Sequence, residues 1–139
     1  MQQRSAGMIH RLTITVHPDL YAICRLGVDA PVPEWAGGSK FLTISRTGIE
    51  LSIVCEENQV PTEIHAERGR RLMQVEGTLA FSLTGILAAV AVPLAEAQVS
   101  IFAVSTYDTD YVLVSEADLD RAIGALEAAG HAVQRISEK

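Results

Sequence analysis

The feature that most constrains the fold of this chain is the stretch at residues 99–115, VSIFAVSTYDTDYVLVS. Two apolar runs, Val99–Val104 and Tyr111–Val114, flank a polar turn at residues 105–110. This pattern is typical of two strands joined by a tight connection. A helical pattern with Gly85 near its start precedes the hairpin, and a capped helical pattern follows it. The chain therefore reads as strand, helix, strand, strand, helix, strand over its second half.

The flanks of the hairpin give the limits of this unit. A helix is predicted from Leu83, with Ser82 as its cap, and Pro93 predicts a kink or an early end. A second helix is predicted after Ser115, which opens a capping-box pattern, and it ends before Gly130. With outer strands at 71–76 and 131–136, the order is βαββαβ, the ferredoxin-like α+β arrangement.

The first half of the chain predicts a related but modified unit. Strands are expected at Ile9–Val16, Leu20–Leu26, Phe41–Ser45 and Leu51–Cys55, the first two joined as a hairpin by a turn at residues 17–19. A Pro/Trp/Gly loop with one short helical turn at Pro33–Ala36 takes the place of a helix. Laying residues 41–58 on residues 101–118, an offset of 60, places Glu50 on Asp110 and indicates an internal duplication. We predict two tandem units, residues 1–68 and 69–139.

Composition excludes several classes of function. A net charge of −6 and a pI near 5.1 argue against a nucleic-acid partner, which needs a basic face. The most apolar segment, Leu79–Ala97, contains Pro93 and Glu96, so we expect a packed helix and not a membrane span. The N-terminal residues lack a signal-peptide pattern, and the two cysteines lie in apolar strand patterns without CxxC spacing. These features predict a cytoplasmic protein with reduced, buried thiols.

Motifs for catalysis are not found in the sequence. No nucleophile–base pair, metal-ligand cluster or phosphate-binding loop is present, so we predict no catalytic residues, no metal and no cofactor. Asp108 and Asp110 have three interpretations: turn formation, a weak metal site, or contact with a ligand. Asp110 can accept hydrogen bonds from the α-ammonium of an amino acid, while the helix start at residues 83–86 can hold its carboxylate. An ordinary helix cap with a packing glycine explains residues 83–86 equally well.

Two segments resemble the ACT domain, of the type found in bacterial ACT-only proteins and in the CASTOR-like arginine sensors of animals. They are residues 77–87, GTLAFSLTGIL, and residues 105–114, STYDTDYVLV. The first half resembles the companion ACT-like module through Trp35 and residues 47–54. The resemblance implies two tandem ACT-like units, the first with a degenerate helix, and regulation by a small ligand held where ACT units meet.

The resemblance also implies a set of ligand contacts. Carried over by position, they are Leu83, Thr84, Gly85 and Ile86 at the helix start, Thr106, Tyr107, Thr109 and Asp110 in the hairpin, and Glu50 as the counterpart in the first unit. Whether the Glu50 site is functional or vestigial stays open. The arginine-sensing relatives carry an acidic residue where this chain has Leu83, so the resemblance disfavours arginine as the ligand.

Two functions from different classes follow. The first hypothesis is a non-catalytic sensor that binds a small molecule, an amino acid, and acts as a homodimer. The alternative is a ligand-free module that docks on a partner enzyme through a strand edge or through the apolar helix at residues 86–94. Neither hypothesis requires nucleic acid or a membrane.

Overall fold

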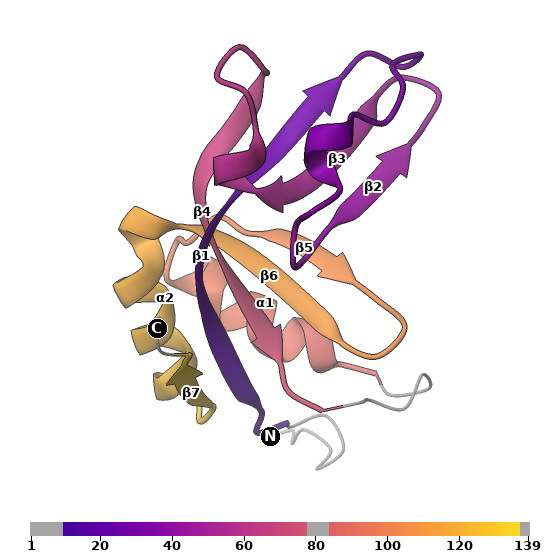
Figure 1. Cartoon of the computed structure of the whole chain (residues 1–139). Helices are drawn as coiled ribbons and strands as arrows, with labels where there is room; N and C mark the ends of the chain where they lie inside the picture. The colour runs from indigo at the N-terminus through magenta and orange to yellow at the C-terminus, as the bar shows by residue number, and fades with distance from the viewer. Residues whose placement is uncertain (1–9, 78–83, 137–139) are drawn as a thin grey trace. The chain divides into compact units, whose positions relative to one another are not determined.

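A computed structural model describes residues 10–77 and 84–136 of the chain (Figure 1). Contacts divide the chain into two compact units. One comprises the residues up to Pro18 together with those from Arg71 onward, and the other is Asp19–Arg70. We call them the discontinuous unit and the inserted unit. No helix among the described residues is long and apolar enough to cross a membrane.

Seven strands, two α-helices and three short 3-10 helices make up the described chain. In chain order they are β1 (Thr13–Leu26), η2 (Glu34–Ala36), β2 (Thr43–Arg46), β3 (Leu51–Glu56), η3 (Glu57–Gln59), β4 (Ala66–Val75), α1 (Ile86–Glu96), β5 (Phe102–Ser105), β6 (Asp110–Ser115), η4 (Glu116–Asp118), α2 (Leu119–Ala128) and β7 (Ala132–Arg135). Both β1 and β4 are shared, because each contributes residues to both units.

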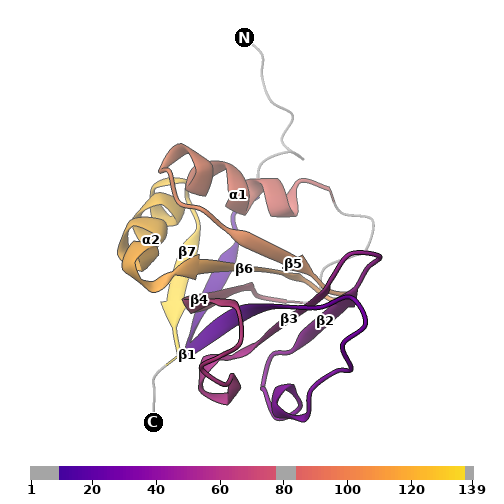
Figure 2. The same ribbon diagram turned by 90° about the horizontal axis from the view of Figure 1, so that it is seen from above.

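The discontinuous unit has the predicted ferredoxin-like order. Its elements β4-α1-β5-β6-α2-β7 follow βαββαβ, and its strands lie in the order β7-β1-β4-β6-β5. The first residues of β1 lie between β7 and β4, and Thr13–Val16 pair in parallel with Ala132–Arg135. Both helices lie on the same face of this sheet (Figure 2) and pack into one aliphatic core. That core includes Ile14, Val16, Met73, Val75, Ile86, Val90, Leu94, Val112, Val114, Leu119, Ala122 and Leu126.

The inserted unit contains strands in the order β2-β3-β1-β4 and, among its residues, no α-helix. The single turn η2 falls within the helical turn predicted at residues 33–36. Trp35 and Ala36 from this turn pack into a second core with β1 and β3. The members of this second core are Ala22, Cys24, Ala36, Leu51, Ile53, Cys55 and Val60, with Leu26, Ala30, Trp35, Ile64 and Ala66 packed against them. The predicted degenerate helix of the first unit is therefore confirmed.

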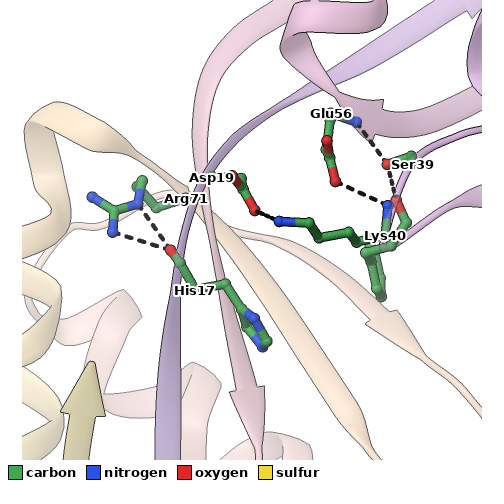
Figure 3. Close-up of polar contacts among 7 residues, drawn as sticks. His17, Asp19, Ser39, Lys40, Glu56 and Arg71 are labelled. Carbon is green, nitrogen blue, oxygen red and sulfur yellow. Dashed lines mark hydrogen bonds and ion pairs between the residues drawn. The ribbon is translucent and has the colours of Figure 1, made fainter. Parts of the chain in front are cut away.

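The hairpin predicted at residues 17–19 is wrong, because β1 runs without a break from Thr13 to Leu26. Pro18 has no N–H to give to a strand ladder, which is why the sequence suggested a turn. In the structure the Arg71 side chain donates from Nε and Nη2 to the His17 carbonyl oxygen, at 3.2 and 3.0 Å (Figure 3). Arg71 thus bonds the backbone next to Pro18, and β1 continues as an extended strand through this position.

The two hairpins confirm a structural repeat, but at an offset of 59 residues and not 60. Arg46 pairs with Leu51 at the end of one hairpin, and Ser105 pairs with Asp110 at the end of the other. The same offset superposes β2 on β5, β3 on β6, and η3 on η4. Aligning the two sequences without a gap favoured an offset that matches Glu50 with Asp110. The pairing of the strands instead matches the two hairpin loops with each other.

Helix α1 begins at Ile86, and the predicted cap Ser82 and start Leu83 lie outside the described residues. The helix continues past Pro93 to Glu96, so it does not end early. Pro93 lacks the N–H that would reach the Ala89 carbonyl one turn before. That carbonyl instead lies 2.9 Å from Nε2 of His131.

Candidate ligand-binding site

The start of α1 is one side of the candidate site. Gly85 is its N-cap residue, with φ of 83°, a left-handed conformation that favours glycine. Gly85 has no side chain that could cap this end, and no capping bond is found among the described residues. The helix dipole favours an anion at this end of the helix. Ile86 is buried in the core, so its side chain anchors the helix, while Thr84 is exposed.

His10 lies at this helix start, although its spacing in sequence gave no signal for it. Its Nε2 is 2.9 Å from the Thr84 carbonyl oxygen, across 74 residues of chain. The ring also faces Gly85, where an added Cβ would lie 3.4 Å from Nε2. The structure adds His10 to the groups that a ligand at this helix start would meet.

The hairpin loop is the second side of the candidate site. The Thr106 N–H and hydroxyl both donate to the Thr109 carbonyl oxygen, at 2.9 and 3.1 Å. Thr109 is only 5% exposed, and its hydroxyl donates to the Val75 carbonyl oxygen at 2.7 Å. Thr109 therefore ties the loop to the end of β4. Tyr107, at the tip of the loop, is 73% exposed.

Asp110, the first residue of β6, is the charged group of the site. Its Oδ1 accepts a hydrogen bond of 2.6 Å from the Ser105 hydroxyl on the opposing strand. Asp110 also lines a narrow apolar gap between the sheet and α1, which is too small to hold a water molecule. The other residues of this gap are Ile14, Met73, Val75, Leu87, Val90, Tyr111 and Val112. Asp110 and Leu87, in the first turn of α1, thus line the same gap.

The surroundings of Tyr111 indicate a negative local field. Partial burial raises the pKa of Tyr111, and the carboxylates of Asp108 and Glu76 raise it further. Asp108 and Glu76 therefore carry their negative charges near Tyr111. Among the described residues, no group of three or more His, Cys, Asp and Glu side chains is placed to hold a metal ion.

Glu50 lies in the inserted unit and does not occupy the position of Asp110 within the repeat. At the observed register Glu50 corresponds to Thr109, and Asp110 corresponds to the buried Leu51. Thr47 reproduces the loop bond of Thr106, because its N–H donates to the Glu50 carbonyl oxygen at 2.9 Å. The Glu50 carboxylate lies 3.7 Å from Nε of Arg25. This acid therefore already faces a cation of its own unit.

The inserted unit contains a second polar network, around Lys40 (Figure 3). Lys40 Nζ is 3.1 Å from Asp19 Oδ2, and its backbone N–H donates to Glu56 Oε2 at 2.9 Å. The Ser39 hydroxyl accepts from the Glu56 N–H at 2.9 Å. These bonds fasten the loop before β2 to β1 and to the end of β3. We interpret the network as structural, because each contact holds the loop to a strand.

Of the predicted site residues, Thr84, Gly85, Ile86, Thr106, Tyr107, Thr109 and Asp110 belong to the discontinuous unit, and Leu83 lies outside the described residues. Their roles as ligand contacts stay predictions. Ser105, which holds Asp110, was missed as a site residue. Its signal in the sequence was weak, since a serine at a hairpin end is common in turns.

Comparison with known proteins gives the family. A family model described as the ACT domain matches residues 65–128, and a model of an N-terminal domain matches residues 19–63. No curated protein matches the chain. A crystal structure of a protein from Agobacterium tumefaciens is 35% identical, with a TM-score of 0.88, and the match covers 93% of this chain and 96% of that one.

More distant structures share the fold. A Vibrio cholerae protein of unknown function, described as a possible transport protein, is 17% identical with a TM-score of 0.70, over 89% of this chain and 94% of that chain. The regulatory subunit of aspartate kinase from Thermus flavus is 12% identical with a TM-score of 0.63, over 86% of this chain and 99% of that chain. ACT domains are regulatory modules that bind small ligands. With the ACT model matched and the βαββαβ unit in place, the chain belongs to the ACT-domain family.

Proposed function

We propose that this protein is a non-catalytic regulatory protein that binds an amino acid, with the ligand held where ACT units meet. The observation that carries the proposal is that Asp110 lines the same gap as Leu87, in the first turn of α1. A zwitterion has its ammonium and carboxylate on one carbon, so a single ligand can meet an acid and a helix start together. The regulatory subunit among the similar structures supports a role without catalysis.

The narrow gap beside Asp110 supports a site that is completed by another ACT unit. The gap is too small for water, so it does not itself enclose a ligand. A ligand on that surface needs a second wall to be shielded from solvent. We therefore propose a homodimer in the cytoplasm as the binding form, with a partner enzyme downstream.

A thermal-shift screen against the twenty amino acids tests the proposal. A ligand at 100 times its dissociation constant stabilises the folded state by about 2.7 kcal/mol, a shift of several degrees in Tm. The Asp110→Asn variant should keep its Tm without ligand and lose the response, because the amide cannot pair with an ammonium.

The matched control is Asp108→Asn, which removes the same charge from an exposed position in the same hairpin. This variant should retain the ligand response within a few tenths of a degree. If both variants respond to the ligand as the wild type does, Asp110 does not hold it and the site is elsewhere.

The apolar character of α1 favours one alternative, a module that docks on a partner without a ligand. The helix carries a single charged residue, Glu96, and Val92 on its outer side is 51% exposed. Helices that are apolar on all sides are normally covered. A screen with no response from any amino acid, together with loss of partner binding in Val92→Glu, would favour this docking function.

A further inference from the structure

The fold brings the two cysteines of the chain together, although 30 residues separate them in the sequence. Cys24 lies on β1 and Cys55 on β3, within the inserted unit. Ala22 pairs with Cys55 and Cys24 pairs with Ile53, so the two thiols are diagonal neighbours on one face of an antiparallel pair. Cys24 is 1% exposed and Cys55 is fully buried. Both belong to the second core.

The two thiols influence each other's pKa. Interaction with Cys55 lowers the pKa of Cys24, burial raises it, and the nearby Arg68 guanidinium lowers it. Interaction with Cys24 and burial raise the pKa of Cys55. The thiolate is the form of cysteine that binds metals, so an ion must displace the protons of both thiols.

The surroundings exclude hard cations. Every other buried member of the second core is an aliphatic side chain, and no cluster of three or more His, Cys, Asp and Glu side chains is found among the described residues. Zinc needs four ligands in a structural site, whereas this pair supplies two sulfurs. Two thiolates in an apolar setting are the ligands that soft cations such as Cu(I) prefer.

The backbone geometry favours a bridging ion over a disulfide. Diagonal neighbours across an antiparallel pair have Cα atoms roughly 7–8 Å apart. Disulfides need Cα atoms within about 4.4–6.8 Å, so closing one here requires the strands to shift. A metal ion between the sulfurs replaces the single S–S bond by two metal–sulfur bonds of about 2.3 Å each, by analogy with zinc thiolates. The Cα atoms can then stay farther apart than a disulfide allows.

We propose that Cys24 and Cys55 form a two-coordinate thiolate site for a soft, monovalent, thiophilic cation, for which Cu(I) is the probe. Binding breaks two S–H bonds, releases two protons to solvent and forms two S–Cu bonds, and the copper remains Cu(I) throughout. Two thiolates and one monovalent cation carry a net charge of −1. Arg68, whose charge already acts on Cys24, compensates it.

Access to the buried pair requires only a local opening. The connection between β1 and β2, residues 27–42, has a single 3-10 turn as regular structure, and its Trp35 and Ala36 pack on the second core. For this loop to lift, the bonds of Ser39 and Lys40 to the strands must break, and a local opening of this kind costs less free energy than unfolding the whole protein. The ion is therefore expected to enter as this loop lifts, while the strands that hold the cysteines stay paired.

The test is an anaerobic titration of the reduced full-length protein with Cu(I), supplied through a competing chromogenic chelator. One ion per chain should be taken up, with a thiolate-to-copper absorption band in the ultraviolet and a rise in Tm. X-ray absorption on the loaded wild-type protein should show two sulfur neighbours around copper. Zn²⁺ under the same conditions should produce no comparable rise in Tm.

Variants assign the site. Cys24→Ser and Cys55→Ser should each lower the affinity for Cu(I) by at least a hundredfold, while Ser52→Ala on the same strand leaves it unchanged. The X-ray absorption measurement needs no variant, so it decides the matter even if a serine variant fails to fold. Absence of uptake, nitrogen or oxygen neighbours in place of sulfur, or undiminished binding in the serine variants would each overturn the proposal.

Discussion

His131 shows how one side chain can replace a missing backbone bond. Its Nδ1 accepts from the Leu12 N–H at 3.1 Å, so Nε2 carries the proton that is donated to the Ala89 carbonyl oxygen. That carbonyl is the one that Pro93 leaves without a helical donor. The ring is 6% exposed and serves two buried backbone groups at once.

Replacing His131 by Leu should destabilise the protein by about 2–4 kcal/mol, because both backbone groups lose their partner. Pro93→Ala restores an N–H that can reach the Ala89 carbonyl. It should therefore stabilise the His131→Leu variant by about 1 kcal/mol more than it stabilises the wild type. Urea unfolding of the four proteins in this double-mutant cycle measures the coupling. Strict additivity would show that the two residues do not serve the same carbonyl.

Residues of the candidate site show the limit of sequence reasoning at this scale. Asp110 could be proposed from its residue type, since a carboxylate at a strand start after a polar turn suits an ammonium. His10 could not, because its contact with Thr84 spans 74 residues and no local pattern reports it. Glu50 was matched to Asp110 by letter, while the register matches it to Thr109.

At the scale of elements, helix α2 was the most predictable part of the chain. Ser115 accepts a hydrogen bond from the Ala117 N–H in the turn η4 that leads into the helix. The chain leaves the helix through Gly130, whose φ is 101°, and the His131 N–H returns to the Leu126 carbonyl oxygen. Start and stop signals of this kind are local, so they can be recognised without tertiary structure.

Two glycines of this segment should respond in opposite directions to alanine. Gly130→Ala should cost about 1–2 kcal/mol, because a left-handed φ is strained for a residue with a Cβ. The new Cβ would also lie 3.1 Å from Nη1 of Arg11. Gly124, inside α2 with open space around it, should gain up to about 1 kcal/mol as alanine. Thermal and urea unfolding of both variants measure these changes, and equal signs would contradict the assignment of the helix end.

Long strands were less predictable than helices. The Pro18 region suggested a turn, yet β1 continues through it with Arg71 bonded to the His17 carbonyl oxygen. Arg71 follows His17 by 54 residues, so this support depends on the pairing of β1 with β4. A local pattern therefore indicated a break that a distant side chain prevents.

At the scale of the whole molecule, the sequence of one compact unit is inserted into the sequence of the other. The predicted boundary between residues 68 and 69 lies inside β4, and the family models meet near residue 64. The contacts instead join residues 71–139 with the N-terminal residues. The division into residues 1–68 and 69–139 remains a prediction about two sequence repeats, and the compact units follow the shared strands.

Unfolding experiments on fragments of the chain can distinguish the division into sequence repeats from the division into compact units. Residues 69–139 alone should fail to show cooperative thermal unfolding, because β7 loses the strand residues Thr13–Val16 with which it pairs. Joining residues 10–18 to residue 71 through a short Gly/Ser linker should restore a cooperative transition by circular dichroism, since Arg71 already contacts His17. Cooperative unfolding of residues 69–139 alone would show that β1 is dispensable for this unit.

By itself, the sequence determined the βαββαβ order, the degenerate helix of the first unit and the ACT resemblance. These depend on periodicity and on local start and stop signals, which act over a few residues. Tertiary structure alone decided the continuity of β1, the register of the repeat, the place of His10 and the meeting of Cys24 with Cys55. Each of these depends on pairing between segments distant in the chain, and hydrogen bonds and packing across such distances leave no local pattern to read.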